Sequence, residues 1–164
     1  MKRLLLLLII LPILFGNPNL AFSQPGKIFR TKYTTIHYME EKDIDDFIWR
    51  LGGQRFEFTY DFYLASSRVD RIIERVEAIL DMRLKKTDNI DVYLLRAPAN
   101  PDKPAALYEY KTKAMYVSID NSSEGVFAHE VAHAVINRYF SPPPPSKIQE
   151  ILTQYVDKYL WSDY

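Results

Sequence analysis

The sequence predicts a single α+β domain with a mixed, mostly antiparallel sheet, and three of its features carry this prediction. Short stretches rich in β-branched and aromatic residues, typical of strands, alternate with stretches whose apolar residues recur at helical spacing. Two of the expected strands are separated by a short turn, which predicts a hairpin. Removing residues 1–23 from the 164 leaves 141, which suffice for one domain and not for two.

The N-terminal part is expected to contain one strand and one helix. Residues 30–38 are rich in β-branched and aromatic side chains and predict a strand. Residues 41–51 carry apolar side chains at helical spacing, and Gly52 with Gly53 is expected to end that helix. Residues 55–64 alternate poorly and are expected to be extended or irregular.

A long helix and a further strand are expected next. Ser67 and Asp70 have the spacing of a capping box, which predicts that the helix begins there. Its apolar stripe consists of Val69, Ile72, Ile73, Val76, Ile79 and Leu80. Residues 89–95 predict a strand, and the three prolines among residues 96–104 predict a loop.

The C-terminal part predicts a hairpin followed by two helices. Residues 106–119 have strand composition on both sides of a turn. Residues 121–125 supply capping side chains for a strongly apolar helix, which the proline run at 142–145 separates from the last helix. Ser146 and Gln149 have the spacing of a second capping box and predict the start of that last helix.

The N-terminal segment has the pattern of a secretory signal peptide. A basic start at residues 1–3 precedes apolar residues 4–15, too few to span a bilayer, and the small residues of 21–23 predict cleavage before Gln24. We therefore expect residues 24–164 to be exported, to the periplasm or the extracellular space, with no stable membrane span; the alternative is a retained anchor. The chain has no cysteine, which excludes a bacterial lipoprotein anchor and disulfides.

Charge argues against one class of partner. The chain has 21 basic and 21 acidic residues, and loss of Lys2 and Arg3 leaves 19 against 21, a net charge of −2. Such a balance lacks the basic surface of a nucleic-acid-binding protein. The twelve tyrosines and nine phenylalanines are expected mainly in the core and on half-buried strands.

His129-Glu130-Val131-Ala132-His133 is the most informative motif, because it has the spacing HExxH. On a helix both histidines project from one face and can bind one Zn²⁺, while Glu130 lies near a metal-bound water. The flanking residues are apolar nearly all round, which predicts a buried helix where three titratable groups would be costly without a metal. The pattern indicates metal-assisted hydrolysis; the alternative is a surface helix with a fortuitous histidine pair.

A catalytic zinc usually takes three protein ligands and a water, so a third ligand is needed besides the two histidines of the motif. His37 lies on the expected first strand, where a lone histidine is more often structural. The metzincin extension would need glycine at position 136 and histidine at 139, whereas this chain has Ile136 and Tyr139. A carboxylate from the last helix is the better candidate.

Residues 149–155 resemble the glutamate-bearing helix of gluzincin metallopeptidases, whose pattern is roughly N-E-G-hydrophobic-A-x-Y. Glu150, 17 residues after His133, matches the ligand and Tyr155 the aromatic residue, although Ile151 and Thr153 replace small residues. Over residues 114–160 the chain is similar to small peptidase-MA-like domains. This resemblance implies a small zincin-like domain with an HExxH active-site helix and a C-terminal Glu-bearing helix. It also implies Zn²⁺ bound by His129, His133 and Glu150.

The position of Glu150 on the last helix leaves two interpretations of its surroundings open. Glu150 falls opposite an expected apolar face made of Ile148, Ile151, Leu152, Tyr155, Val156, Tyr159 and Leu160. Its polar stripe therefore borders either an open cleft or bulk solvent, and Asp157 on that stripe is an alternative ligand. Gln154 stands where similar proteins place a carboxylate that orients the first histidine.

The sequence also offers candidates for the group that stabilises the oxyanion and for the strand that binds the substrate. The oxyanion-stabilising candidates are Tyr155, Tyr108, Tyr116 and Tyr159. In similar enzymes the strand containing Tyr116 and Val117 is the sheet edge to which an extended substrate adds, and the alternative is an interior strand. We expect an exported zinc metallopeptidase acting on peptides or proteins with Glu130 as general base, or alternatively a non-catalytic, zinc-stabilised binding module.

Overall fold

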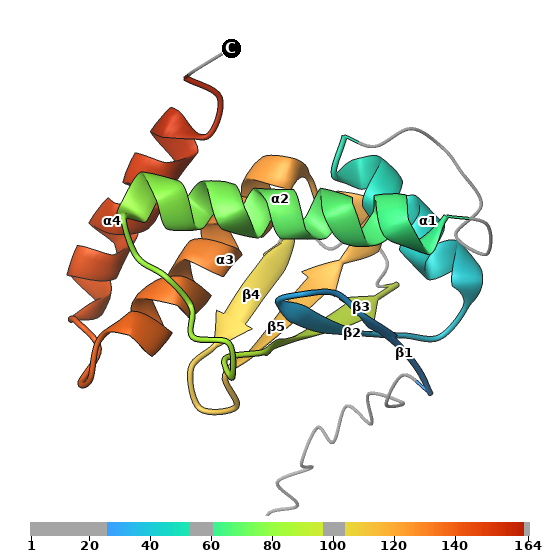
Figure 1. Ribbon diagram of the computed structural model, residues 1–164, viewed down its shortest axis with the longest axis horizontal. Coiled ribbons are helices and arrows are strands. Elements are labelled where there is room, and N and C mark those ends of the chain that lie inside the picture. Colours follow the sequence, from blue (N-terminus) through green and yellow to red (C-terminus); the bar gives the residue numbers. More distant parts are fainter. Residues whose placement is uncertain (1–25, 53–60, 97–103, 163–164) are drawn as a thin grey trace, which may run out of the picture.

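A computed structural model describes residues 26–52, 61–96 and 104–162, which form one layer of helices packed on a sheet (Figure 1). The expected signal peptide at 1–23 and most of the expected loop at 96–104 lie outside these residues, as do residues 55–60 of the segment expected to be irregular. No described helix is long and apolar enough to cross a membrane. The strands are β1 (Lys27–Arg30), β2 (Thr34–Tyr38), β3 (Ile90–Leu95), β4 (Ala106–Glu109) and β5 (Ala114–Ser118). The helices are α1 (Glu41–Arg50), α2 (Phe62–Leu80), α3 (Glu124–Tyr139) and α4 (Ser146–Tyr159), with a short 3-10 turn, η2 (Ile119–Asn121).

The sheet is mixed, in the order β1-β2-β3-β5-β4. Strands β2, β3 and β5 are parallel, while β1 and β4 add antiparallel at the two edges. The α+β class and the mixed sheet are thus confirmed, but the expectation of a mostly antiparallel sheet is wrong, because pairings of the two kinds are equal in number. The helices α1 and α2 provide the crossover that a parallel pairing of β2 with β3 requires.

The expected first strand at 30–38 is two strands joined by a tight turn. Thr31 makes the turn, because its Oγ1 accepts hydrogen bonds from the backbone N–H groups of Tyr33 and Thr34, at 3.2 and 3.1 Å. Arg30 then faces Thr35 across an antiparallel pair. The turn residues have strand-forming side chains, so composition alone did not reveal the reversal.

Helix α1 ends as expected, whereas α2 begins earlier than expected. Gly52, at φ 77°, follows the last residues of α1 and adopts a backbone conformation that favours glycine. Asp61 caps α2 by accepting the N–H of Leu64 at 3.0 Å, so the predicted start at Ser67 and Asp70 is wrong. Asp70 instead accepts hydrogen bonds from the Ser66 hydroxyl and the Lys32 N–H.

The core lies between one face of the sheet and the helices. Alternate strand residues such as Ile36, Val92 and Val117 are fully buried against helix residues such as Ile73 and Phe127. On the other sheet face the rings of His37, Tyr93 and Tyr116 stack in a row, with centroid distances of 4.3 and 5.2 Å. The tyrosine content is thus partly explained by this row.

Helix α3 is the buried helix that its apolar flanks predict. It contacts α2, α4 and β4, and its seven fully buried side chains occupy most of its circumference: Phe127, Ala128, Val131, Ala132, Ala134, Val135 and Ile136. The sheet edge and α4 therefore fix the direction in which its remaining polar side chains can point.

Candidate metal centre

The HExxH residues occupy one side of the middle of α3. Ser123 caps this helix by accepting the N–H of Val126 at 3.3 Å. His129 and His133 then project side by side, with ring centroids 5.1 Å apart. Both imidazoles are partly buried and lie against α4, which runs next to α3 (Figure 1).

Helix α4 is rotated relative to the orientation that its apolar residues predict. Ile148, Ile151 and Tyr155 are about half exposed, at 46, 55 and 49%. The side chains that α4 buries are instead Gln149, Thr153, Val156 and, just after the helix, Leu160. Of the predicted apolar face, Val156 and Leu160 are thus confirmed as buried and Leu152 packs against the core, whereas the prediction is wrong for Ile148, Ile151 and Tyr155. Polar residues can replace apolar ones on the inner face because Gln149 finds hydrogen-bond partners there.

This rotation places Glu150 opposite the two histidines. Glu150 Oε1 lies 3.4 Å from His133 Nε2, and its Oε2 lies 3.8 Å from His129 Nε2. Tetrahedral zinc with bonds of about 2.0–2.1 Å separates its ligand atoms by roughly 3.3 Å, close to these distances. His129, His133 and Glu150 thus form a group that could hold a metal ion. Two imidazole nitrogens with one carboxylate oxygen are a donor set that suits Zn²⁺.

His129 is held by Asp157 and not by the expected Gln154. The Asp157 Oδ2 lies 2.9 Å from His129 Nδ1, which leaves Nε2 directed at Glu150. Residues seven apart on a helix lie about 20° from each other, so Asp157 shares the stripe of Glu150. Gln154, four residues after Glu150, lies about 40° from it on the other side and is exposed. A carboxylate therefore contacts the first histidine, but it comes three residues after Gln154. In this geometry Asp157 contacts His129 Nδ1 and lies outside the group of residues that could hold a metal ion.

Gln149 holds the second histidine, a role that the sequence did not suggest. Its Oε1 lies 3.4 Å from His133 Nδ1 and accepts a hydrogen bond from Asn137 Nδ2 at 3.0 Å. Its Nε2 donates to the Pro144 carbonyl at 2.8 Å and also contacts the Tyr110 hydroxyl. The expected capping box is therefore wrong, since Pro145 is the cap residue and Gln149 points into the core. The only sequence signal for this role is its position directly before Glu150.

Glu130 is anchored to the edge of the sheet. Its Oε2 accepts the backbone N–H of Tyr108 on β4 at 2.6 Å. That bond fixes the carboxylate between α3 and β4 while leaving its second oxygen outside the interaction. Glu130 is not among the three residues that could hold the metal, so its carboxylate is positioned beside the centre and not within it.

The strand beside the centre is β4 and not β5. Strand β5 lies between β3 and β4, so the edge-strand role expected for Tyr116 and Val117 is wrong. Val117 is fully buried, and Tyr116 belongs to the stacked row on the opposite sheet face. The chain reversal at the β4–β5 hairpin, which returns β5 next to β3, decides this order.

The four tyrosines expected near the reaction centre point elsewhere. Tyr155 and Tyr159 pack on each other on α4 at 4.5 Å, and Tyr155 is about 140° round the helix from Glu150. The Tyr108 hydroxyl accepts a hydrogen bond from Arg138 at 3.3 Å, and burial raises the pKa of this phenol, with the Arg138 charge opposing the shift. His37 is also remote in its contacts, since its Nε2 pairs with Asp91 at 2.9 Å.

Comparisons with protein families, with curated proteins and with solved structures found no match. The site is therefore interpreted from its own geometry.

The contact between Asp157 and His129 gives a direct test. Replacing Asp157 with alanine should weaken Zn²⁺ binding by about 10- to 100-fold, because the imidazole loses the partner that orients it. Isothermal titration of zinc into the apo-protein measures the effect, and Gln154→Ala is the matched control on the same helix. Equal weakening by both variants would show that Asp157 has no special role.

Proposed function

We propose that this protein is an exported zinc metallopeptidase that cleaves peptide bonds in peptides or proteins. The observation that carries the proposal is an open centre of His129, His133 and Glu150 with Glu130 anchored beside it. Three protein ligands leave a fourth position for water, which distinguishes catalytic zinc sites from structural ones. Glu150 is half exposed, with 52% of its side chain accessible, so solvent reaches the group of residues that could hold the metal.

Each residue near the centre has a separate task in this proposal. Bound zinc would supply a Lewis acid and lower the pKa of its water. The Glu130 carboxylate would take a proton from the attacking water as its oxygen bonds to the carbonyl carbon, and would pass that proton to the nitrogen as the C–N bond breaks. Asp157 and Gln149 hold the imidazoles so that both Nε2 atoms face Glu150. The β4 backbone keeps Glu130 close to the reacting atoms through the Tyr108 N–H.

One observation favours a second candidate, a non-catalytic binding module stabilised by zinc. Peptide hydrolysis needs a group that stabilises the developing oxyanion. The hydroxyl of Tyr108 is engaged by Arg138, Tyr116 lies on the far sheet face, and Tyr155 packs with Tyr159. The contacts of these four tyrosines therefore do not support any of them as the group that stabilises the oxyanion. A centre that binds zinc and peptides but never hydrolyses them would fit this candidate.

Metal removal tests the proposal and separates the two candidates. Dialysis against a chelator should abolish peptide cleavage, and added Zn²⁺ should restore it. The melting temperature should fall by at least about 5 °C, because zinc joins α3 to α4 and binds only the folded chain. Mass spectrometry of a peptide mixture and differential scanning calorimetry are the two measurements. Cleavage that survives complete zinc removal contradicts the proposal, whereas a thermal shift without any cleavage supports the binding module.

A further inference from the structure

Helix α4 presents a stripe of large apolar side chains to solvent. Ile148, Ile151 and Tyr155 are each about half exposed. Residues three, four and seven apart lie on one side of a helix, so these three side chains form one continuous surface, here called the outer face of α4. Apolar residues scattered singly on a surface are ordinary, whereas a stripe at helical spacing usually faces a binding partner.

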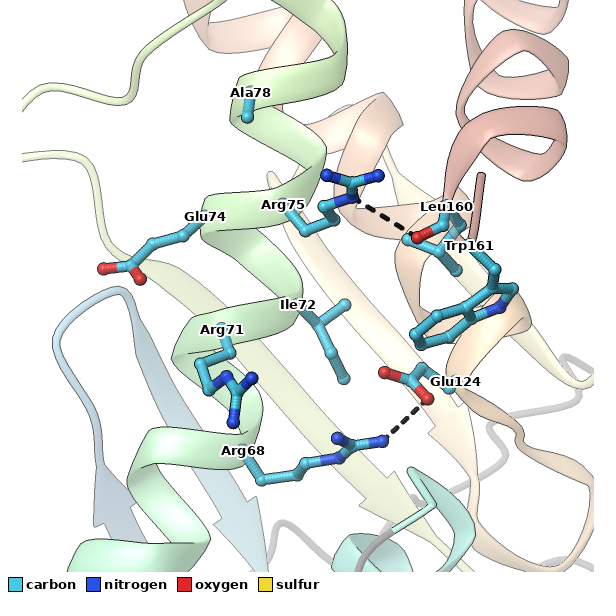
Figure 2. A pocket seen from close by; sticks show the side chains of 9 residues that line it. All are labelled: Arg68, Arg71, Ile72, Glu74, Arg75, Ala78, Glu124, Leu160 and Trp161. Carbon is cyan, nitrogen blue, oxygen red and sulfur yellow. Dashed lines mark hydrogen bonds and ion pairs between the residues drawn. The ribbon is translucent and has the colours of Figure 1, made fainter. Parts of the chain in front are cut away.

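Contacts along the length of α4 keep this face turned outward. Near the start of the helix, Gln149 is buried and hydrogen-bonded in the core. Further along, Asp157 contacts His129. At the end, Figure 2 shows the Arg75 side chain projecting from α2 to donate a hydrogen bond to the Leu160 carbonyl, at 3.3 Å. Because these contacts oppose rotation of the helix, the outer face can be covered only by something that approaches from outside.

The charged side chains of α4 are divided between two sides of the helix. Its two carboxylates, Glu150 and Asp157, lie next to the histidines, about 100 and 120° round from Ile151. Lys147 and Lys158 are exposed and lie only about 40 and 20° from Ile151, one near each end of the helix. The outer face is therefore flanked by positive charge, while the negative charge of the helix is turned toward the candidate metal centre.

Two exposed aromatic residues lie at the end of the molecule where α4 begins. Tyr139 ends α3 and Phe140 follows it, with their ring centroids 5.1 Å apart. Both are exposed, and the short proline-rich connection from α3 to α4 keeps them at this end (Figure 1). Aromatic rings of this kind are enriched where a protein meets the boundary between lipid and water.

We propose that the outer face of α4 binds the surface of a membrane that contains anionic lipids. The helix would lie in the plane of the surface, with Ile148, Ile151 and Tyr155 between the headgroups and the acyl chains. Lys147 and Lys158 have long side chains that reach the lipid phosphates while their stems stay on the apolar side. This inference does not depend on the proposed function, because none of these five residues belongs to the candidate metal centre.

The two lysines favour a lipid surface over a second copy of the chain. An antiparallel pair of α4 helices, joined through their outer faces, would bring Lys147 of one copy close to Lys158 of the other. Like charges at such a contact oppose association. A surface of anionic lipids carries the complementary charge along the whole helix.

Flotation of the protein with lipid vesicles tests this inference. The mature protein, residues 24–164, is used because the apolar residues 4–15 would themselves bind lipid. Vesicles of phosphatidylcholine and phosphatidylglycerol in equal parts should bind the protein at least about fivefold more tightly than vesicles of phosphatidylcholine alone. Ile151→Gln and Tyr155→Gln should each weaken binding to the mixed vesicles about tenfold, because each removes apolar surface from the lipid.

Matched variants separate the two contributions to binding. Ile28→Gln is the apolar control, since Ile28 is also about half exposed but lies on β1. Lys147→Gln should weaken binding to the mixed vesicles about fivefold, and added salt should reduce that effect. Lys86→Gln, at an exposed lysine before β3, should leave binding unchanged. Melting temperatures of all variants confirm that each is folded.

Three results would overturn the inference. The first is an absence of binding to the mixed vesicles. The second is binding that Ile151→Gln and Tyr155→Gln leave unchanged, and the third is equal binding to both kinds of vesicle. Gel filtration of the same preparations identifies the competing occupant: a dimer that Ile151→Gln dissociates, without any vesicle binding, would assign the outer face to a second copy of the chain.

Discussion

Replacing Glu130 with glutamine should lower kcat/KM for peptide cleavage by about 10²- to 10⁴-fold, the usual contribution of a general base. The amide has nearly the same shape, and its oxygen can still accept the Tyr108 N–H that now fixes the carboxylate. It cannot take a proton from water. Zinc should remain bound, because Glu130 is outside the group of residues that could hold the ion.

Cleavage rates and zinc content are therefore measured on the same preparation of Glu130→Gln. Glu109→Gln is a matched control on β4, where the carboxylate accepts a hydrogen bond from the Lys111 N–H at 3.1 Å and takes no part in the centre. Activity equal to that of the natural protein would remove Glu130 from the mechanism. Loss of zinc would instead make Glu130 a ligand.

Replacing Glu150 with alanine should raise the zinc dissociation constant more than Asp157→Ala does. Glu150 is the only carboxylate that lies near both Nε2 atoms, at 3.4 and 3.8 Å, among the described residues. Its removal would eliminate one of the three proposed protein ligands, and with it the proposed link from α4 to the metal. We expect an increase above 100-fold, beyond the effect typical of a residue that only orients a ligand.

Zinc titration of the three variants Glu150→Ala, Asp157→Ala and Gln154→Ala ranks these residues on one helix. The expected order of weakening is Glu150 first, Asp157 second and Gln154 with little effect. A larger loss for Asp157 than for Glu150 would mean that Asp157 is the metal ligand and that the observed contact with His129 changes on binding.

The sequence predicted the parts of the centre that depend on local spacing. The four-residue interval between His129 and His133 places both on one side of any α-helix. Apolar residues flanking them required a buried helix, which α3 is. The resemblance of residues 149–155 to a known pattern predicts Glu150 as the third member, and the fold brings it to the histidines.

The sequence does not predict which residues orient the histidines, because these interactions depend on tertiary contacts. Hydrophobic spacing placed Ile151 and Tyr155 on the inner face of α4, but the helix is set by the hydrogen bonds of buried Gln149. Once α4 is turned in this way, Asp157 and not Gln154 reaches His129. Side-chain amides give no periodic signal, so the rotation could not be read from the pattern.

The sequence also does not predict which strand lies at the edge of the sheet, because this depends on the topology. The hairpin of β4 and β5 was expected, but either of its strands could pair with β3. Pairing of β5 with β3 leaves β4 at the edge, where the Tyr108 N–H meets Glu130. The same pairing leaves Ala105 and Ala106 in the wall of an open cavity of about 420 Å³ that Glu130 also lines.

The zinc content of the purified mature protein tests the central claim most directly, namely that His129, His133 and Glu150 bind one metal ion together. After gel filtration, elemental analysis should find about one zinc per chain in the natural protein and much less in Glu150→Ala. A natural protein that takes up no zinc, or a Glu150→Ala variant that retains it equally, would contradict the account.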